Sequence, residues 1–180
     1  MKKRSTSQEP ILTVKIPMAR IPVLIGKNGE TKRKIERLAN VKIKVNSRTG
    51  DVEVYQTGEN TDPTIPLKMK SIITAIARGF SPEKALLLLN DNYTLRIVDL
   101  RQYGKTKNAI RRIRGRIIGT EGSARQFIEE ETGAHISIYG HTVAIIGRLE
   151  EVVPAVQAIE MLASGSKHAT VYRLLRRWER

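Results

Sequence analysis

The 180-residue sequence contains no cysteine. Disulfide bonds, thiolate metal sites and a cysteine nucleophile are therefore excluded, and this composition fits an intracellular, cytoplasmic protein. The sequence also lacks any apolar run near the roughly 18 residues that a membrane span requires, so we expect no membrane contact. Its opening residues, MKKRSTSQEP, are basic and then polar, which argues against a secretory signal; we interpret residues 1–9 as a flexible tail.

Acidic and aromatic residues are both scarce. There are 18 Asp and Glu against 32 Lys and Arg, a formal net charge of +14, with a pI near 10.3. This excess of positive charge predicts a polyanionic partner, and nucleic acid is the leading candidate. Adaptation to heat explains a high content of charged residues but not an excess of one sign. Aromatic residues make up 4% of the chain, which argues against an RNA recognition motif domain, whose sheet stacks bases on aromatic rings.

Two glycine pairs reveal an internal repeat. GKNG at 26–29 and GTEG at 119–122 are the only Gly-x-x-Gly pairs, and placing one on the other aligns residues 23–45 with 116–138 without a gap. Aliphatic and acidic positions coincide at Ile25 and Ile118, Ile35 and Ile128, Glu36 and Glu129, Ile43 and Ile136, and Val45 and Ile138. We infer two copies of one fold, each of about 80 to 90 residues.

The apolar spacing changes period along each copy and predicts the order of elements. A strand precedes the glycine turn, a helix follows it, and two strands and a last helix complete each copy. Strands are expected at 12–16, 41–45, 51–56, 94–100, 134–139 and 142–147. Helices are expected after Gly29, with Ile35 and Leu38 at helical spacing, from about 66, and at 108–118, 124–131 and 152–162.

Two further helices are expected outside the copies. Residues 81–91 begin with Ser81 as helix cap and Pro82 at the first helical position, and four leucines follow. We interpret them as a buried helix that seals the two copies together. Residues 166–180 predict a basic amphipathic helix with Val171, Leu174, Leu175 and Trp178 on one face. The simpler interpretation is a docked final helix with a solvated basic side, and the alternative is a free arm that binds RNA or a partner.

The pattern of an aliphatic residue, Ile, Gly-x-x-Gly, a helix with Ile-Glu at its centre and an alternating strand resembles KH domains. The resemblance implies an α+β fold of two tandem eukaryotic-type (type I) KH domains at about 10–80 and 92–165. Each would pack a three-stranded sheet on three helices. In this family the Gly-x-x-Gly loop clamps the backbone of about four unpaired nucleotides. Glycine lets the RNA approach the main chain, and the next helix presents free amides to phosphate.

The resemblance implies RNA-binding residues at the turns, on the helices beside them and along an aliphatic groove, although for any single groove residue we favour ordinary core. These residues are Gly26, Lys27, Asn28, Gly29, Lys32, Arg33, Ile25, Ile43 and Val45 in the first copy, and Arg114, Arg116, Ile118, Gly119, Thr120, Glu121, Gly122, Arg125, Ile136 and Ile138 in the second.

The two copies differ in charge. Residues 20–48 carry a net charge of +7, whereas the aligned residues 113–141 carry −1. We therefore expect the first copy to supply most of the electrostatic affinity and the second to supply shape and selectivity. Glu121 within the second turn opposes phosphate contact there. Basic residues just upstream offer compensation; they are Arg101, Lys105, Lys107, Arg111 and Arg112.

Catalytic and metal-binding motifs are not recognisable. GKT at 104–106 is not a P-loop, because Asp99 stands where the motif needs glycine. Glu129, Glu130 and Glu131 are adjacent on a predicted helix and point in different directions, so we favour a solvated helix end over a nuclease metal site. The three histidines, His135, His141 and His168, show no metal-ligand spacing. We expect no enzyme activity and no cofactor.

Three longer stretches resemble the Partner-of-Nob (Dim2-like) family of archaeal and eukaryotic small-ribosomal-subunit assembly factors. They are ARGFSPEKALLLL (77–89), HISIYGHTVAIIG (135–147) and GSKHATVYRLLRRWER (165–180). We expect a monomer. Membership implies binding of single-stranded rRNA near the 3′ end of the small-subunit rRNA precursor. It also implies cooperation with a Nob-type endonuclease and other assembly factors. The alternatives are an adaptor of an RNA-degrading exosome, a ribosome-resident structural protein, or a nuclease in its own right.

Overall fold

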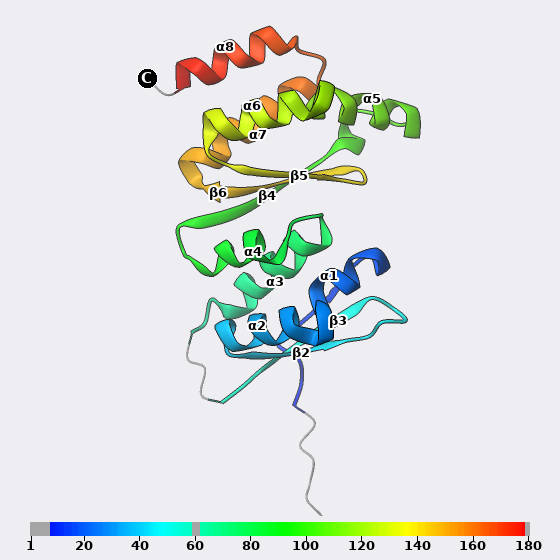
Figure 1. Ribbon diagram of the computed structural model, residues 1–180, viewed down its shortest axis with the longest axis vertical. Helices are drawn as coiled ribbons and strands as arrows, with labels where there is room; N and C mark the ends of the chain where they lie inside the picture. The colour runs from blue at the N-terminus through cyan, green and yellow to red at the C-terminus, as the bar shows by residue number, and fades with distance from the viewer. Residues whose placement is uncertain (1–7, 59–61, 179–180) are drawn as a thin grey trace, which may run out of the picture. The chain divides into compact units, whose positions relative to one another are not determined.

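The computed structural model describes residues 8–58 and 62–178. Most of the predicted N-terminal tail and the last two residues of the predicted C-terminal helix lie outside this range. The chain divides into two compact units (Figure 1). The first ends at Ala77 and also takes in Ser81–Leu89; the second comprises Arg78–Phe80 and the residues from Asn90 onward. Each contains one three-stranded antiparallel sheet with helices, which confirms the predicted α+β class.

The first unit has the predicted order of elements, with the strands in the order β1-β3-β2. Val14 pairs with Val52 and Ile43 with Val54, so alternate apolar residues of all three strands share one buried face. The elements are β1 (Leu12–Lys15), a 3-10 turn (Met18–Arg20), α1 (Ile21–Ile25), a second 3-10 turn (Lys27–Gly29), α2 (Glu30–Ala39), β2 (Val41–Val45), β3 (Asp51–Gln56) and α3 (Ile65–Ala77).

Helix α1, which leads into the first turn, is short. Pro22 lies in its first turn, where the missing N–H is tolerated, and a proline further inside would break the helix. The helix therefore starts at Ile21 and has only five residues. Its counterpart in the second unit has no proline and runs for twelve residues.

The segment between the copies is not the single helix that was predicted for 81–91. The predicted cap is confirmed: Ser81 Oγ accepts a hydrogen bond from Lys84 N, and Pro82 starts the helix. However, α4 (Pro82–Ala85) is followed by a 3-10 turn (Leu86–Leu89). In a 3-10 turn residues three apart face the same side, so Ala85 and Leu88 are buried while the other leucines are half-buried.

The second unit repeats this architecture, with strand order β4-β6-β5, and adds a helix. Its elements are β4 (Tyr93–Asp99), a 3-10 turn (Leu100–Gln102), α5 (Lys107–Ile118), a 3-10 turn (Thr120–Gly122), α6 (Ser123–Thr132), β5 (His135–Tyr139), β6 (Thr142–Arg148), α7 (Leu149–Ala163) and α8 (His168–Trp178). Helices α6 and α7 cover one face of the sheet, and α8 lies over these helices on the side away from it (Figure 1).

The predicted docking of the C-terminal helix is confirmed. Val171 and Leu175 are buried in the core cluster of the second unit. Tyr172 stacks on Phe127 of α6 with ring centroids 4.0 Å apart. Trp178 is 48% exposed, so it lies at the margin of the apolar face and not at its centre.

Candidate nucleic-acid interface

The two glycine turns have the same backbone conformation. Gly26 and Gly119 have φ/ψ of 72°/178° and 75°/174°, and Gly29 and Gly122 have 74°/12° and 76°/13°. All four φ values lie in the region that favours glycine. The glycines therefore determine the turn in both copies. The repeat inferred from the sequence is confirmed, because the paired glycines agree in both φ and ψ.

The first glycine of each turn also provides room. A Cβ on Gly26 would lie 2.1 Å from Thr31 Oγ1, and one on Gly119 would lie 2.6 Å from the backbone N of Ala124. Gly122 differs, because a Cβ there would meet nothing within 4 Å. Gly119 is thus needed for both space and conformation, whereas Gly122 is needed for conformation alone.

The third position of each turn is left-handed without being glycine. Asn28 has φ/ψ of 54°/26° and Glu121 has 55°/30°. Asparagine tolerates this region better than most side chains, whereas glutamate has no such preference. Glu121 is therefore unfavourable in two ways: it brings strain to the backbone and negative charge to the turn.

A ten-residue helix begins directly after each turn. The residue before α2 is Gly29 and the residue before α6 is Gly122, and neither helix has a side-chain cap. The first helical residues, Glu30 and Ser123, donate their N–H groups to Lys27 O and Thr120 O within the turns, and no side chain caps either helix. The N-terminus of each helix therefore presents its positive dipole end beside the turn. This arrangement suits an anion such as a phosphate.

The predicted basic residues of the first copy have different surroundings. Lys27 and Arg33 are exposed, and Arg33 Nη1 lies 3.0 Å from the position of a Cβ on Gly29. The Lys32 ammonium instead donates to the backbone O of Ile43 at 3.1 Å and lies 3.7 Å from Glu36 Oε1. Lys27 and Arg33 are therefore available at the turn, while Lys32 is bound to the edge strand β2.

A glutamate in each copy links the helix after the turn to an edge strand. Glu36 Oε2 accepts a hydrogen bond from Ile43 N at 2.9 Å, and Glu129 Oε1 accepts one from Ile136 N at 2.8 Å. The alignment of these residues in the repeat was visible in the sequence, but no role was predicted for them. They fix the distance between the turn helix and the strand that would form the opposite wall of a groove.

The predicted aliphatic groove residues fall into two groups. Ile43 and Ile136 are each 2% exposed and belong to the cores of their units, as their simpler interpretation suggested. The others keep some exposure and remain candidates to contact a base; they are Ile25, Val45, Ile118 and Ile138.

Arg116 is held within the second unit. Its guanidinium donates through Nε to Leu162 O at 3.2 Å and through Nη2 to Ser166 O. His168 Nε2 donates to the backbone O of Arg116 at 2.7 Å. Arg116 therefore ties the end of α5 to the α7–α8 connection, a contact between residues about 50 positions apart that no local pattern predicts.

Arg114 and Arg125, the other predicted arginines of this copy, are half-buried. The Nε atom of Arg114 is buried and has no hydrogen-bond partner among the described residues.

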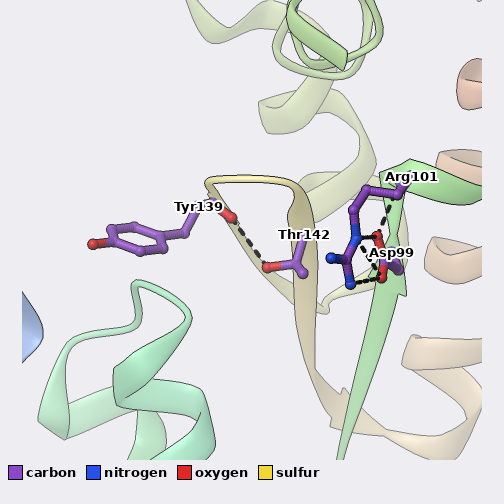
Figure 2. Close-up of polar contacts among 4 residues, drawn as sticks. All are labelled: Asp99, Arg101, Tyr139 and Thr142. Atoms are coloured by element: carbon purple, nitrogen blue, oxygen red, sulfur yellow. Dashed lines mark hydrogen bonds and ion pairs between the residues drawn. The ribbon is translucent and has the colours of Figure 1, made fainter. Parts of the chain in front are cut away.

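Arg101 does not offer free charge to the second turn. Figure 2 shows its guanidinium bound to both carboxylate oxygens of Asp99, with Nη2 2.7 Å from Oδ2. This contact lowers the pKa of the Asp99 carboxyl to about 2. In the same figure Thr142 Oγ1 donates to Tyr139 O at 3.0 Å across the β5–β6 hairpin. Of the upstream basic residues, Arg112 lines the same cavity as Gly119 and Thr120.

Within the described residues, no group of three or more His, Asp or Glu side chains is placed to hold a metal ion. The predicted cluster is dispersed: Glu129 binds the strand and Glu130 accepts from Gln126. None of the described helices has the length and apolar character to cross a membrane.

Family models match both units. Residues 94–180 match the second KH domain of PNO1, a eukaryotic type KH-domain (KH-domain type I), and residues 11–64 match the KH domain family. The structure resembles a chain in the crystal structure of the a/eIF2alpha–aDim2p–rRNA complex from Pyrococcus horikoshii OT3, with a TM-score of 0.87, 49% identity and 93% of each chain covered.

Two relatives extend these matches. A KH domain-containing protein of Methanocaldococcus jannaschii is 46% identical over 91% of this chain and 72% of its own length. The pre-rRNA-processing protein pno1 of Aspergillus fumigatus is 28% identical over 76% of this chain, which spans 56% of that longer protein. By these matches and by its two KH-type units, the chain belongs to the archaeal Dim2/PNO1-like family of KH-domain proteins.

Proposed function

We propose that this protein binds unpaired RNA through its two glycine turns and acts in biogenesis of the small ribosomal subunit. Its target is the region near the 3′ end of the small-subunit rRNA precursor, where it assists trimming by a Nob-type endonuclease. The observation that carries the proposal is the pair of uncapped Gly-x-x-Gly turns, each opening onto the N-terminus of a ten-residue helix. Such a turn holds about four nucleotides by their backbone.

Charge and relatives support the same proposal. A net charge of +14 favours a polyanion over any other partner class. One relative is a pre-rRNA-processing protein, and a similar solved chain belongs to a complex that contains rRNA. The half-buried Ile25, Val45, Ile118 and Ile138 leave aliphatic surface for bases.

The binding experiment compares three labelled RNAs by fluorescence anisotropy at fixed salt: a single-stranded fragment from the 3′ end of the precursor, a shuffled fragment of the same composition, and a matched hairpin stem. We expect the authentic fragment to bind most tightly and the stem most weakly, because KH grooves read exposed bases. Equal affinity for the stem contradicts binding of unpaired RNA, and equal affinity for the shuffled strand contradicts the 3′-end target.

A cleavage experiment separates a binding factor from a nuclease. The protein is incubated with the labelled fragment and divalent metal, with and without a Nob-type endonuclease. We expect no cleavage by the protein alone and faster or more accurate trimming when both are present. Cleavage without the endonuclease, abolished by chelation, contradicts the binding role.

A further inference from the structure

A cavity of about 540 Å³ lies beside the second glycine turn. Gly119 and Thr120 of the turn, Arg112 of α5, Ser123 of α6, and His168 and Tyr172 of α8 contribute to its lining. Its volume is in the range of pockets that hold small ligands. Neither Ile118 nor the strand residues Ile136 and Ile138 line it, so the cavity is separate from the aliphatic groove.

The wall of the cavity formed by α8 is fixed by internal bonds. Arg116 binds Leu162 O in the last turn of α7 and Ser166 O just before α8, and His168 binds Arg116 O at the start of α8. Tyr172, one turn later, is supported by Phe127. Because these contacts are already made in the protein alone, a ligand would find the wall in place.

The lining combines groups that suit a nucleotide. Within the described residues, the exposed guanidinium of Arg112 has no hydrogen-bond or ion-pair partner, so it can bind a phosphate. Ser123 adds a hydroxyl group to the lining. Gly119 has no side chain, so a ligand can approach the main chain there. Tyr172 supplies an aromatic ring, and base–aromatic stacking is a recurrent means of holding single-stranded nucleic acid.

The first unit has no counterpart of this wall. After α3 its chain forms α4 and a 3-10 turn that pack back on α3, whereas α8 packs on α6 and α7. We propose that the cavity is an additional RNA subsite of the second KH unit, which takes one nucleotide beyond those held at the turn, with its phosphate on Arg112 and its base or sugar on Tyr172. This inference rests on the proposed RNA binding and extends the footprint of the second unit.

The test measures how affinity depends on RNA length. The protein is the full chain carrying Lys27→Asp and Asn28→Asp, which weakens the first turn. RNAs of about four nucleotides are compared with strands extended by about three nucleotides at either end. We expect tighter binding on extension at one end. Arg112→Gln should remove most of that gain and lower the salt slope for the extended strand by about 0.7, the value of one phosphate contact.

Arg111→Gln is the matched control, because Arg111 is an exposed neighbour on α5 that does not line the cavity. It should leave the gain from extension unchanged. Tyr172→Leu should weaken the extended strand by about 5- to 150-fold while the short strand is held as before. Tyr172→Leu can also loosen α8, so a second readout is needed. In the protein that keeps Tyr172, 4-thiouridine in the extended strand should crosslink to this tyrosine.

Outcomes for the two proposals are distinct. Failure of the unmodified protein to bind any of these RNAs overturns the proposed function. Binding that is insensitive to extension, or equal losses for short and extended strands in Arg112→Gln, overturns the subsite. Complete loss of binding in the Lys27→Asp and Asn28→Asp background, with the unmodified protein still binding, also overturns it, since the second unit then holds no RNA.

Discussion

Glu129 and Ile136 are seven residues apart in sequence and joined by a hydrogen bond of 2.8 Å from the Ile136 amide to Glu129 Oε1. Glu36 and Ile43 make the same contact in the first unit. In each case the acceptor lies on the helix after the glycine turn and the donor lies on an edge strand, so one bond sets the width of the surface between them.

Loss of this bond should destabilise the second unit. Glu129→Ala leaves a partly buried amide unpaired, and we expect the free energy of unfolding to fall by about 1–3 kcal/mol. Urea titration measures the loss, and hydrogen exchange at the Ile136 amide should quicken. Glu130→Ala is the control, because the neighbouring Glu130 is exposed and, among the residues that the structure describes, bonds only Gln126 in its own helix. Equal losses in both variants would contradict a specific role of Glu129.

Exchanging the third residues of the turns should have opposite effects. Glu121→Asn places a residue that tolerates left-handed backbone at φ 55°, and we expect a gain of about 1 kcal/mol in unfolding free energy. The reciprocal Asn28→Glu should lose a similar amount. RNA affinity should rise in the first variant and fall in the second, because a carboxylate is removed or added at the phosphate site. Thermal unfolding measures the change in stability, and fluorescence anisotropy measures the change in RNA affinity. If both variants changed the unfolding free energy in the same direction, backbone strain at this position would be contradicted.

The two glycines of the second turn should not be equally tolerant of alanine. Gly122→Ala meets no neighbour, so its cost is the conformational penalty of about 1–2 kcal/mol alone. Gly119→Ala adds a Cβ 2.6 Å from a backbone nitrogen, which cannot move without shifting α6. We expect the larger loss of stability and of RNA binding in Gly119→Ala. A smaller loss there than in Gly122→Ala would show that space at the first glycine is unimportant.

The Asp99–Arg101 pair predicts a pH-dependent contribution to stability. The pKa of Asp99 is lowered to about 2, so its ionised form is favoured by folding. The contribution is complete above the ordinary carboxyl pKa of about 4 and is lost as pH falls through about 2. Asp99→Asn should therefore destabilise the protein at pH 7, and the two unfolding curves should converge between pH 4 and 2. A stability difference between the two proteins that persists unchanged down to pH 2 would contradict this contribution.

Salt dependence should distinguish the two turns. Lys27→Asp with Asn28→Asp should weaken RNA binding strongly and reduce the slope of log affinity against log salt by about 0.7 for each lost phosphate contact. Thr120→Asp with Glu121→Asp should cost less, because the second turn is already acidic. A larger loss in the second variant would contradict the expectation that the first copy supplies most of the electrostatic affinity.

Local patterns in the sequence predicted the repeat, the strands and the glycine turns, because alternation and helical spacing are properties of a few neighbouring residues. They could not reveal that Lys32 binds Ile43 O or that Arg116 binds Leu162 O. A basic residue in a sequence normally indicates a solvated side chain, and only the fold brings it to a carbonyl group. The net charge of −1 was counted over residues 113–141 and leaves out Arg112, which lines the same cavity as Gly119 and Thr120.

The closely matched dihedral angles of the two turns have a consequence for how this surface can diversify. Since Gly26 and Gly29, like Gly119 and Gly122, determine the path of the main chain, the two residues between them contribute chemistry without altering the geometry. Asn28 and Glu121 occupy equivalent places with different charge. A duplicated domain built in this way can acquire a new ligand preference in one copy by a single substitution, while the other copy keeps the original one.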